Sequence, residues 1–167
     1  MSQRDRLLGR RVPPTPVTIR VDFSPDADAA YAEHEAALRD LETVAARGAD
    51  PTAAHALVAE TKAALAPYQE VLQVSPIPPS QYDELMGEHP PTDAQREAGY
   101  IWNPDTFGPA ILAACTGQDL PDDERMSEKD WIDWASSATS GHAEYILLVN
   151  TALAVNDRTL NIQVGKD

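Results

Sequence analysis

The chain has a single cysteine, and this scarcity excludes whole classes of site. Cys115 is the only thiol among 167 residues, so no internal disulfide can form and a zinc site built from several thiolates is ruled out. One cysteine is also typical of proteins that fold in a reducing compartment. Glycine is sparse as well: the eight glycines are scattered and form neither a phosphate-binding loop nor a dinucleotide fingerprint.

Long apolar runs are missing too. No stretch approaches the roughly 20 apolar residues that cross a bilayer, so we expect no transmembrane helix and no membrane partner. The N-terminal segment MSQRDRLLGRRVPPTP contains arginines but no apolar stretch of signal-peptide length. Together these absences predict a protein that acts in the cytoplasm in which it is made.

Basic residues are few and concentrated at the N-terminus. The net charge is −14, yet residues 1–20 hold five arginines against one aspartate, a local charge of +4. The remainder holds eight Lys and Arg against twenty-six acids, or −18. Nucleic-acid phosphates bind clustered cations, so the negative charge of residues 21–167 predicts no nucleic-acid partner. We interpret residues 1–16 as a basic, flexible arm, and its contact with an acidic partner or RNA is the alternative.

Catalytic constellations are not found either. The four histidines are too sparse for a metal site on spacing alone, and His34 has no second histidine at zincin spacing. His89 follows a glutamate, but the neighbouring sequence offers no nucleophile and no anion cradle. The acidic segment DLPDDER lacks the alternating spacing and central glycine of a calcium loop. We therefore predict no catalytic residue, no metal site and no cofactor, which makes an enzyme the least supported class.

Two segments have the alternation of β-strands. In VTIRVDF (17–23) the apolar residues Val17, Ile19, Val21 and Phe23 share one face. The segment YQEVLQVSPI (68–77) is a second strand candidate, and we expect it to pair with the first.

Between these strands, residues 26–66 predict two antiparallel helices. The first ends near Gly48, a typical C-terminal residue, and the second begins at Asp50-Pro51. Both helices are rich in alanine and charge, so only a thin apolar seam is left for packing on each other or on a partner. We predict that this seam binds the partner. Its members are Tyr31, Leu38, Leu41, Leu57 and Leu65.

From Pro79 onward the sequence predicts short helices separated by prolines. Thr92 and Ser127 are expected N-caps, and Asn103-Pro104 opens a helix that directs Phe107 into the core. The segment GHAEYILLVNTALAVN (141–156) is the most apolar helix and is expected to run through the centre of the core.

These elements predict a mainly α fold with a small β component. The expected order is a strand, a projecting helical hairpin, a second strand and then a compact bundle of short helices. Residues 17–157 are expected to form a single globular domain. Residues 158–167 are expected to form a C-terminal tail that alternates like an edge strand.

Three segments carry a likeness to a known family. They are PIPPSQYDELMGEHPPTDAQ (76–95), WNPDTFGPAILAAC (102–115) and MSEKDWIDWASSATSGHAEYILLVNTALAVN (126–156). In this order and spacing the chain resembles the tail assembly chaperones of long-tailed bacteriophages, particularly those of actinobacterial hosts. The resemblance covers residues 68–157 well and 17–67 loosely. One departure is SGHAE at 140–144, where related proteins often carry a G-x-W-x-x-L pattern.

The resemblance implies that its most specific residues are a folding signature and not an active site. A proline pair would fix the path of the chain into the helix that starts at Asn103, because each proline restricts the residue before it. The signature residues are Pro90, Pro91, Asn103, Pro104, Phe107 and Asn156.

The resemblance also implies a function. A family member binds the tape-measure protein, a long helical chain that would aggregate alone, and keeps it soluble until tail-tube subunits assemble around it. It is then expected in the host cytoplasm during assembly and absent from the mature virion. A longer product made by ribosomal frameshifting would reach the major tail-tube protein. Gly165-Lys166 is compatible with a slippery codon run and equally with an ordinary polar tail.

Two other classes of function stay open. A structural virion component, such as a head–tail connector or a tail terminator, would remain stoichiometric in finished particles. An acidic adaptor or DNA mimic would bind a basic DNA-binding protein tightly, as the charge of −18 over residues 21–167 allows.

Overall fold

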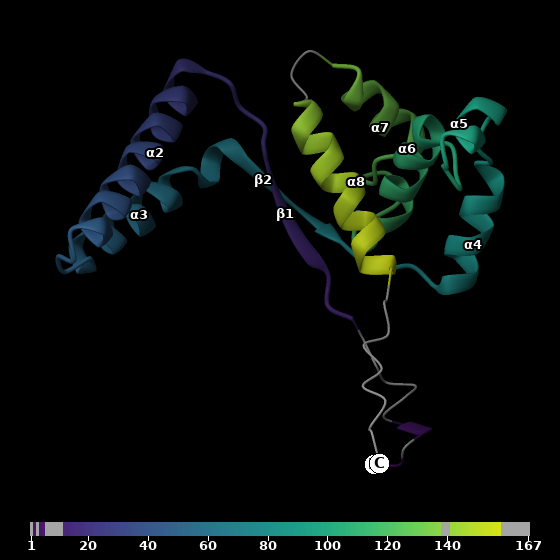
Figure 1. Cartoon of the computed structure of the whole chain (residues 1–167), viewed down its shortest axis with the longest axis horizontal. Coiled ribbons are helices and arrows are strands. Elements are labelled where there is room, and N and C mark those ends of the chain that lie inside the picture. The colour runs from purple at the N-terminus through teal and green to yellow at the C-terminus, as the bar shows by residue number, and fades with distance from the viewer. Residues whose placement is uncertain (1, 3, 6–11, 138–140, 158–167) are drawn as a thin grey trace. The chain divides into compact units, whose positions relative to one another are not determined.

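The computed structural model describes residues 2, 4–5, 12–137 and 141–157. The chain divides into two compact units (Figure 1). The hairpin unit comprises Thr18–Val71, and the bundle unit comprises Met1–Val17 together with Leu72–Asp167. Where the sequence predicted a single domain, the structure thus distinguishes two units, because the two long helices of the hairpin unit make most of their contacts with each other.

A two-stranded antiparallel sheet joins β1 (Thr15–Arg20) to β2 (Gln69–Val74). The backbone N–H of Val21 extends the ladder by donating to the carbonyl oxygen of Tyr68 at 3.0 Å. The predicted pairing of the two strand segments is therefore confirmed. β1 starts at Thr15, which lies within the predicted arm.

The first strand is shorter than predicted at its C-terminal end. Val17 and Ile19 are buried as expected, but Val21 and Phe23 are 53% and 48% exposed. The reason is Arg20, whose Nε donates to the Asp22 carbonyl at 2.6 Å and whose guanidinium lies over the Phe23 ring. These contacts of Arg20 lie where the chain leaves the sheet towards the next helix. Val21 and Phe23 therefore do not extend the apolar face of the strand as expected.

The hairpin unit is built from α2 (Pro25–Ala46) and α3 (Thr52–Ala64), which lie side by side in Figure 1. Ser24 caps α2, and Gly48 has φ +65 in the turn between the helices, a conformation that favours glycine. A short 3₁₀ turn, η1 (Ala66–Tyr68), leads into β2. The buried positions of the two helices are alanines, so the helices pack closely while burying little apolar area. These are Ala27, Ala37 and Ala54.

Five helices of the bundle unit lie between residues 72 and 157, within the described part of the chain. They are α4 (Pro79–Glu88), α5 (Asp93–Glu97), α6 (Pro104–Cys115), α7 (Glu128–Ala135) and α8 (His142–Asn156). The predicted N-caps are confirmed: Thr92 and Ser127 both form capping boxes, and Asn103 caps α6. A mainly α fold with a small β component is likewise confirmed.

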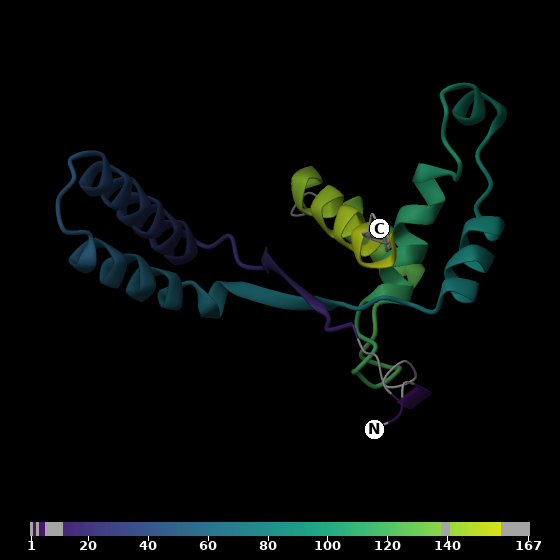
Figure 2. The same ribbon diagram turned by 60° about the horizontal axis from the view of Figure 1, so that its bottom comes forward.

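Helix α6 forms the centre of the bundle unit, in contact with α4, α7 and α8. Figure 2 shows α6, in green, between α8 and α4. Every residue from 107 to 112 is buried. The sequence assigned this central place to α8, and that prediction is wrong. Leu148 and Ala152 are fully buried, but Leu147 is 50% exposed and Ile146 is 41% exposed. α8 is apolar on all sides although the bundle covers only one of its faces.

Gly108 allows α6 and α8 to approach closely. A Cβ at this position would overlap the hydroxyl of Tyr145 on α8 and lie 3.3 Å from its Cζ. Gly108→Ala is therefore expected to lower the free energy of unfolding by about 2 kcal/mol, as overpacking of a core typically does. Urea unfolding followed by tryptophan fluorescence measures the change.

Two further variants separate this clash from a general effect of removing glycine. Gly87, within α4, has nothing within 4 Å of its Cβ position, so Gly87→Ala should be neutral or stabilising. Adding Tyr145→Phe to Gly108→Ala removes the overlapping hydroxyl and should recover much of the loss. Equal effects of the two glycine replacements would contradict the close-packing account.

Several predictions fall on residues that the structure does not describe. Most of the basic arm and the whole tail 158–167, with Gly165 and Lys166, lie outside the described residues. Within the described part of the chain, no helix combines the length and the apolar character needed to cross a membrane.

Candidate partner-binding surface

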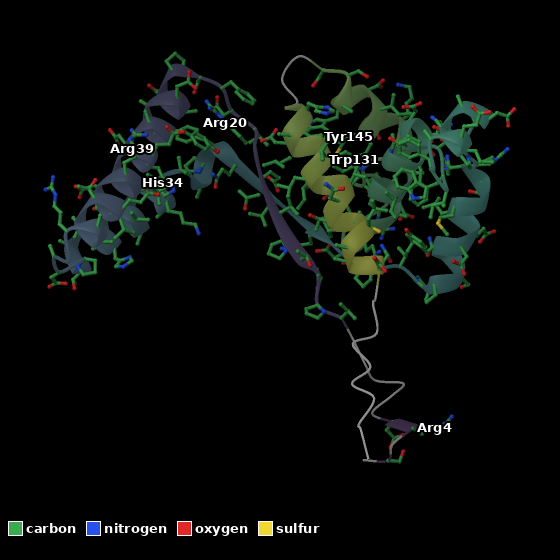
Figure 3. All side chains as sticks on the ribbon, in the orientation of Figure 1. Arg4, Arg20, His34, Arg39, Trp131 and Tyr145 are labelled. Carbon is green, nitrogen blue, oxygen red and sulfur yellow. The ribbon has the colours of Figure 1, made fainter. Side chains whose placement is uncertain are left out.

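Tyr31, the first predicted partner-binding residue, is engaged inside the hairpin unit. Its hydroxyl accepts a hydrogen bond from Gln69 Nε2 at 3.0 Å. The Arg20 guanidinium lies 4.5 Å from its ring centroid, a cation–π contact. Figure 3 labels Arg20 where β1 leads towards α2. The side chain is half-buried, so Tyr31 joins the strand pair to α2 and offers little free surface.

The four predicted leucines divide into two groups. Leu65 is only 3% exposed, and Leu41 is half-buried, so both belong to the interior of the hairpin unit. Leu38 and Leu57 are 41% and 43% exposed, on α2 and α3 respectively. Of the five predicted residues, only these two keep a large apolar surface for a partner.

A polar contact lies within the seam between α2 and α3. His34 Nδ1 and Thr61 Oγ1 are 3.0 Å apart, and Thr61 also donates to the carbonyl oxygen of Leu57 at 2.9 Å. A histidine and a threonine at seam positions fix the register of two helices that otherwise meet through alanines. His34 therefore has a structural partner.

The surface of the hairpin unit is acidic. Residues 18–71 contain ten Asp and Glu against four Lys and Arg, a charge of −6. Its ion pairs, Arg39 with Glu35 and Arg20 with Asp28, involve exposed carboxylates and contribute little stability. Two exposed leucines on an acidic helical surface suit a partner with apolar side chains and a neutral or basic surround.

The signature residues around position 103 fix the entry into α6. Asn103 Oδ1 accepts from the Asp105 N–H at 3.0 Å, and Pro104 occupies the first turn. The Asn103 backbone N–H donates to the His89 carbonyl at 2.8 Å, closing the loop that contains Pro90 and Pro91. The two prolines and the asparagine cap therefore act on one structural element.

Phe107 lies at the centre of an aromatic cluster. It is fully buried. Its ring centroid lies 4.9 Å from that of Trp102, 6.0 Å from Tyr82 and 6.1 Å from His89. These neighbours come from α4, from the end of α4 and from the loop before α6. Phe107 thus packs α4 and the loop before α6 against α6, the central helix.

Asn156 joins three segments at the C-terminus of α8. Its Oδ1 accepts from the Ile77 N–H at 2.9 Å, and its Nδ2 donates to the Ala152 carbonyl at 2.7 Å and lies 3.2 Å from Cys115 Sγ. Burial raises the pKa of the Cys115 thiol, and the contact with Asn156 opposes this more weakly. The same cysteine's carbonyl accepts from the Ser75 N–H at 2.7 Å. Cys115 is therefore buried at the joint that Asn156 forms between the end of α8, α6 and the chain after β2.

An open pocket of about 310 Å³ lies beside this joint. Sequence reasoning missed it because its walls come from α4 and the end of α8, which are far apart along the chain. Burial, followed by the charge of Asp157, raises the pKa of the Tyr82 phenol in its wall. The lining residues are Ile77, Pro79, Tyr82, Asp83, Asn156 and Asp157.

Other exposed apolar residues were also missed. Ile101, in the loop before α6, is 74% exposed, and Ile132 on α7 is 44% exposed. No periodic pattern in the sequence identifies Ile101 as an exposed apolar residue. In α8, which is apolar all round, periodicity cannot tell the covered face from the open one.

No group of three or more His, Cys, Asp or Glu side chains suited to a metal ion occurs among the described residues. Comparisons of the chain with protein-family models, with curated proteins and with solved structures find no match.

Proposed function

We propose that this chain is a tail assembly chaperone of a long-tailed bacteriophage, which binds the tape-measure protein and keeps it soluble during tail assembly. The observation that carries the proposal is the place of the signature residues. Three of these residues belong to the segments that resemble the family. Asn103 caps α6, Phe107 is fully buried in the bundle unit, and Asn156 at the end of α8 bonds to Ile77. This agrees with their interpretation as a folding signature.

The hairpin unit is the proposed contact surface. A tape-measure protein exposes apolar helical stripes before the tube assembles around it. Leu38 and Leu57 offer apolar contacts on helices whose buried positions are alanines. Such small contacts bind weakly one by one, so that tube subunits can displace the chaperone. The net charge of −14 keeps the coated complex soluble through like-charge repulsion.

Co-expression with the tape-measure protein encoded by the same phage tests this function. We expect the tape-measure protein to remain soluble and to co-purify with this chain, and mass spectrometry of mature particles to find this chain absent. A tape-measure protein that precipitates equally with and without the chain would refute the proposal. Stoichiometric amounts in purified particles would instead favour a connector or a tail terminator.

A paired variant tests the contact surface. Leu38→Glu combined with Leu57→Glu removes both exposed leucines and is expected to weaken the complex at least about tenfold, as the loss of central apolar contacts typically does. The two residues are 41% and 43% exposed, so the circular dichroism of the free protein should change little.

The matched control is Ala36→Glu combined with Ala56→Glu. It adds the same charge at exposed positions of the same two helices but leaves the leucines in place. We expect it to reduce binding far less than the leucine variant. Equal binding by the wild type and the leucine variant would exclude these residues as the contact surface while leaving the co-expression result unaffected.

A further inference from the structure

The pocket between the start of α4 and the end of α8 is lined by both apolar side chains and two carboxylates. Ile77, Pro79 and the Tyr82 ring provide apolar surface, and Asp83 and Asp157 add negative charge. Both aspartates are exposed. Within the described ranges of the chain, neither forms an ion pair with a basic side chain.

Its surroundings strengthen the negative potential. The C-terminus of α8 ends at the pocket, and the last turn of this helix contains no basic residue, so the negative end of the helix dipole is not compensated there. Residues 72–157 contain fifteen Asp and Glu against three Lys and Arg, a charge of −12. An apolar wall with an aromatic ring and carboxylates suits a guanidinium, which stacks on rings and binds carboxylates in its plane.

The chain's own arginine-rich segment begins close to this pocket. Antiparallel pairing brings the start of β1 beside the end of β2, and Ile77 of the pocket follows β2 by three residues. Arg10 and Arg11 precede Thr15, the first residue of β1, by five and four residues. At roughly 3.3 Å per extended residue, that stretch spans about 13–17 Å. The arginines are therefore within reach of the pocket.

We propose that this pocket is the docking site of the chain's own N-terminal arm, with the guanidinium of Arg10 or Arg11 between Asp83 and Asp157. Charge complementarity carries the choice of occupant, since residues 1–16 have a charge of +3 and the body they meet −12. The docked arm cannot bridge the acidic surfaces of neighbouring copies. This inference does not depend on the proposed chaperone function.

Trypsin cleavage of the full chain tests the docking, because a protease cuts a bound segment only after it opens. In low salt, cleavage after Arg10 and Arg11, followed by mass spectrometry, should be about fivefold slower in the wild type than in Asp83→Asn combined with Asp157→Asn. At about 0.5 M salt, where the Debye length is only a few ångströms, the difference should largely vanish.

The matched control is Asp119→Asn combined with Asp123→Asn, which removes the same charge from exposed positions of an acidic loop. It should keep the slow cleavage of the wild type. Equal rates in the wild type and the pocket variant would overturn the proposal. Protection that disappears on dilution would place the arm on a neighbouring copy and would likewise overturn it.

Discussion

Phe107→Ala is expected to lower the free energy of unfolding of the bundle unit by about 3–5 kcal/mol, the usual cost of truncating a buried phenylalanine. The side chain has no exposed surface. Its removal leaves a cavity between α6 and the rings of Tyr82, His89 and Trp102. Because these rings come from three different segments, the structure cannot close the cavity by moving a single side chain.

Tryptophan fluorescence measures this change in the bundle unit alone. The chain's three tryptophans, at positions 102, 131 and 134, all belong to that unit. The midpoint of urea unfolding seen by fluorescence should fall sharply, while helical circular dichroism retains a contribution from the hairpin unit. This separation also tests whether the two units unfold independently.

Tyr100→Ala is the control for the loss of an aromatic ring. Tyr100 precedes the same helix but is 48% exposed, so its truncation should cost less than about 1 kcal/mol. Similar losses from the two substitutions would show that the aromatic cluster does not hold the bundle together.

Asn156→Ala is expected to cost about 3 kcal/mol, because one side chain serves three partners. The substitution leaves the Ile77 N–H without its acceptor and removes the bonds to the Ala152 carbonyl and Cys115 Sγ. The C-terminus of α8 should then separate from α6 and from the chain that follows β2.

The buried thiol reports this separation directly. Cys115 is fully buried and is the chain's only cysteine, so its reaction with a thiol reagent requires opening of the joint. Asn156→Ala should accelerate that reaction at least about tenfold. Asn150→Ala, on the same helix at an exposed position, is the control and should leave the rate unchanged. An unchanged rate in Asn156→Ala would contradict the role of this residue as the joint.

Local sequence determined most of the secondary structure. Alternation in 17–23 and 68–77 predicted the two strands, and Thr92, Asn103 and Ser127 predicted helix starts that the structure confirms. These features depend on neighbours within a few residues, so they can be read along the chain. The single cysteine and the scattered glycines likewise excluded disulfides and phosphate loops without any coordinates.

Tertiary structure alone decided which apolar residues are exposed to solvent. Leu57 and Leu65 follow the same helical pattern, yet the first is 43% exposed and the second 3%. The sequence pattern favoured α8 as the central helix, but α6 takes that place because it contacts α4, α7 and α8. The pocket beside Asn156 also depends on residues far apart in sequence. Burial is set by contacts between distant segments, and hydrophobic periodicity identifies an apolar face without telling whether another element covers it.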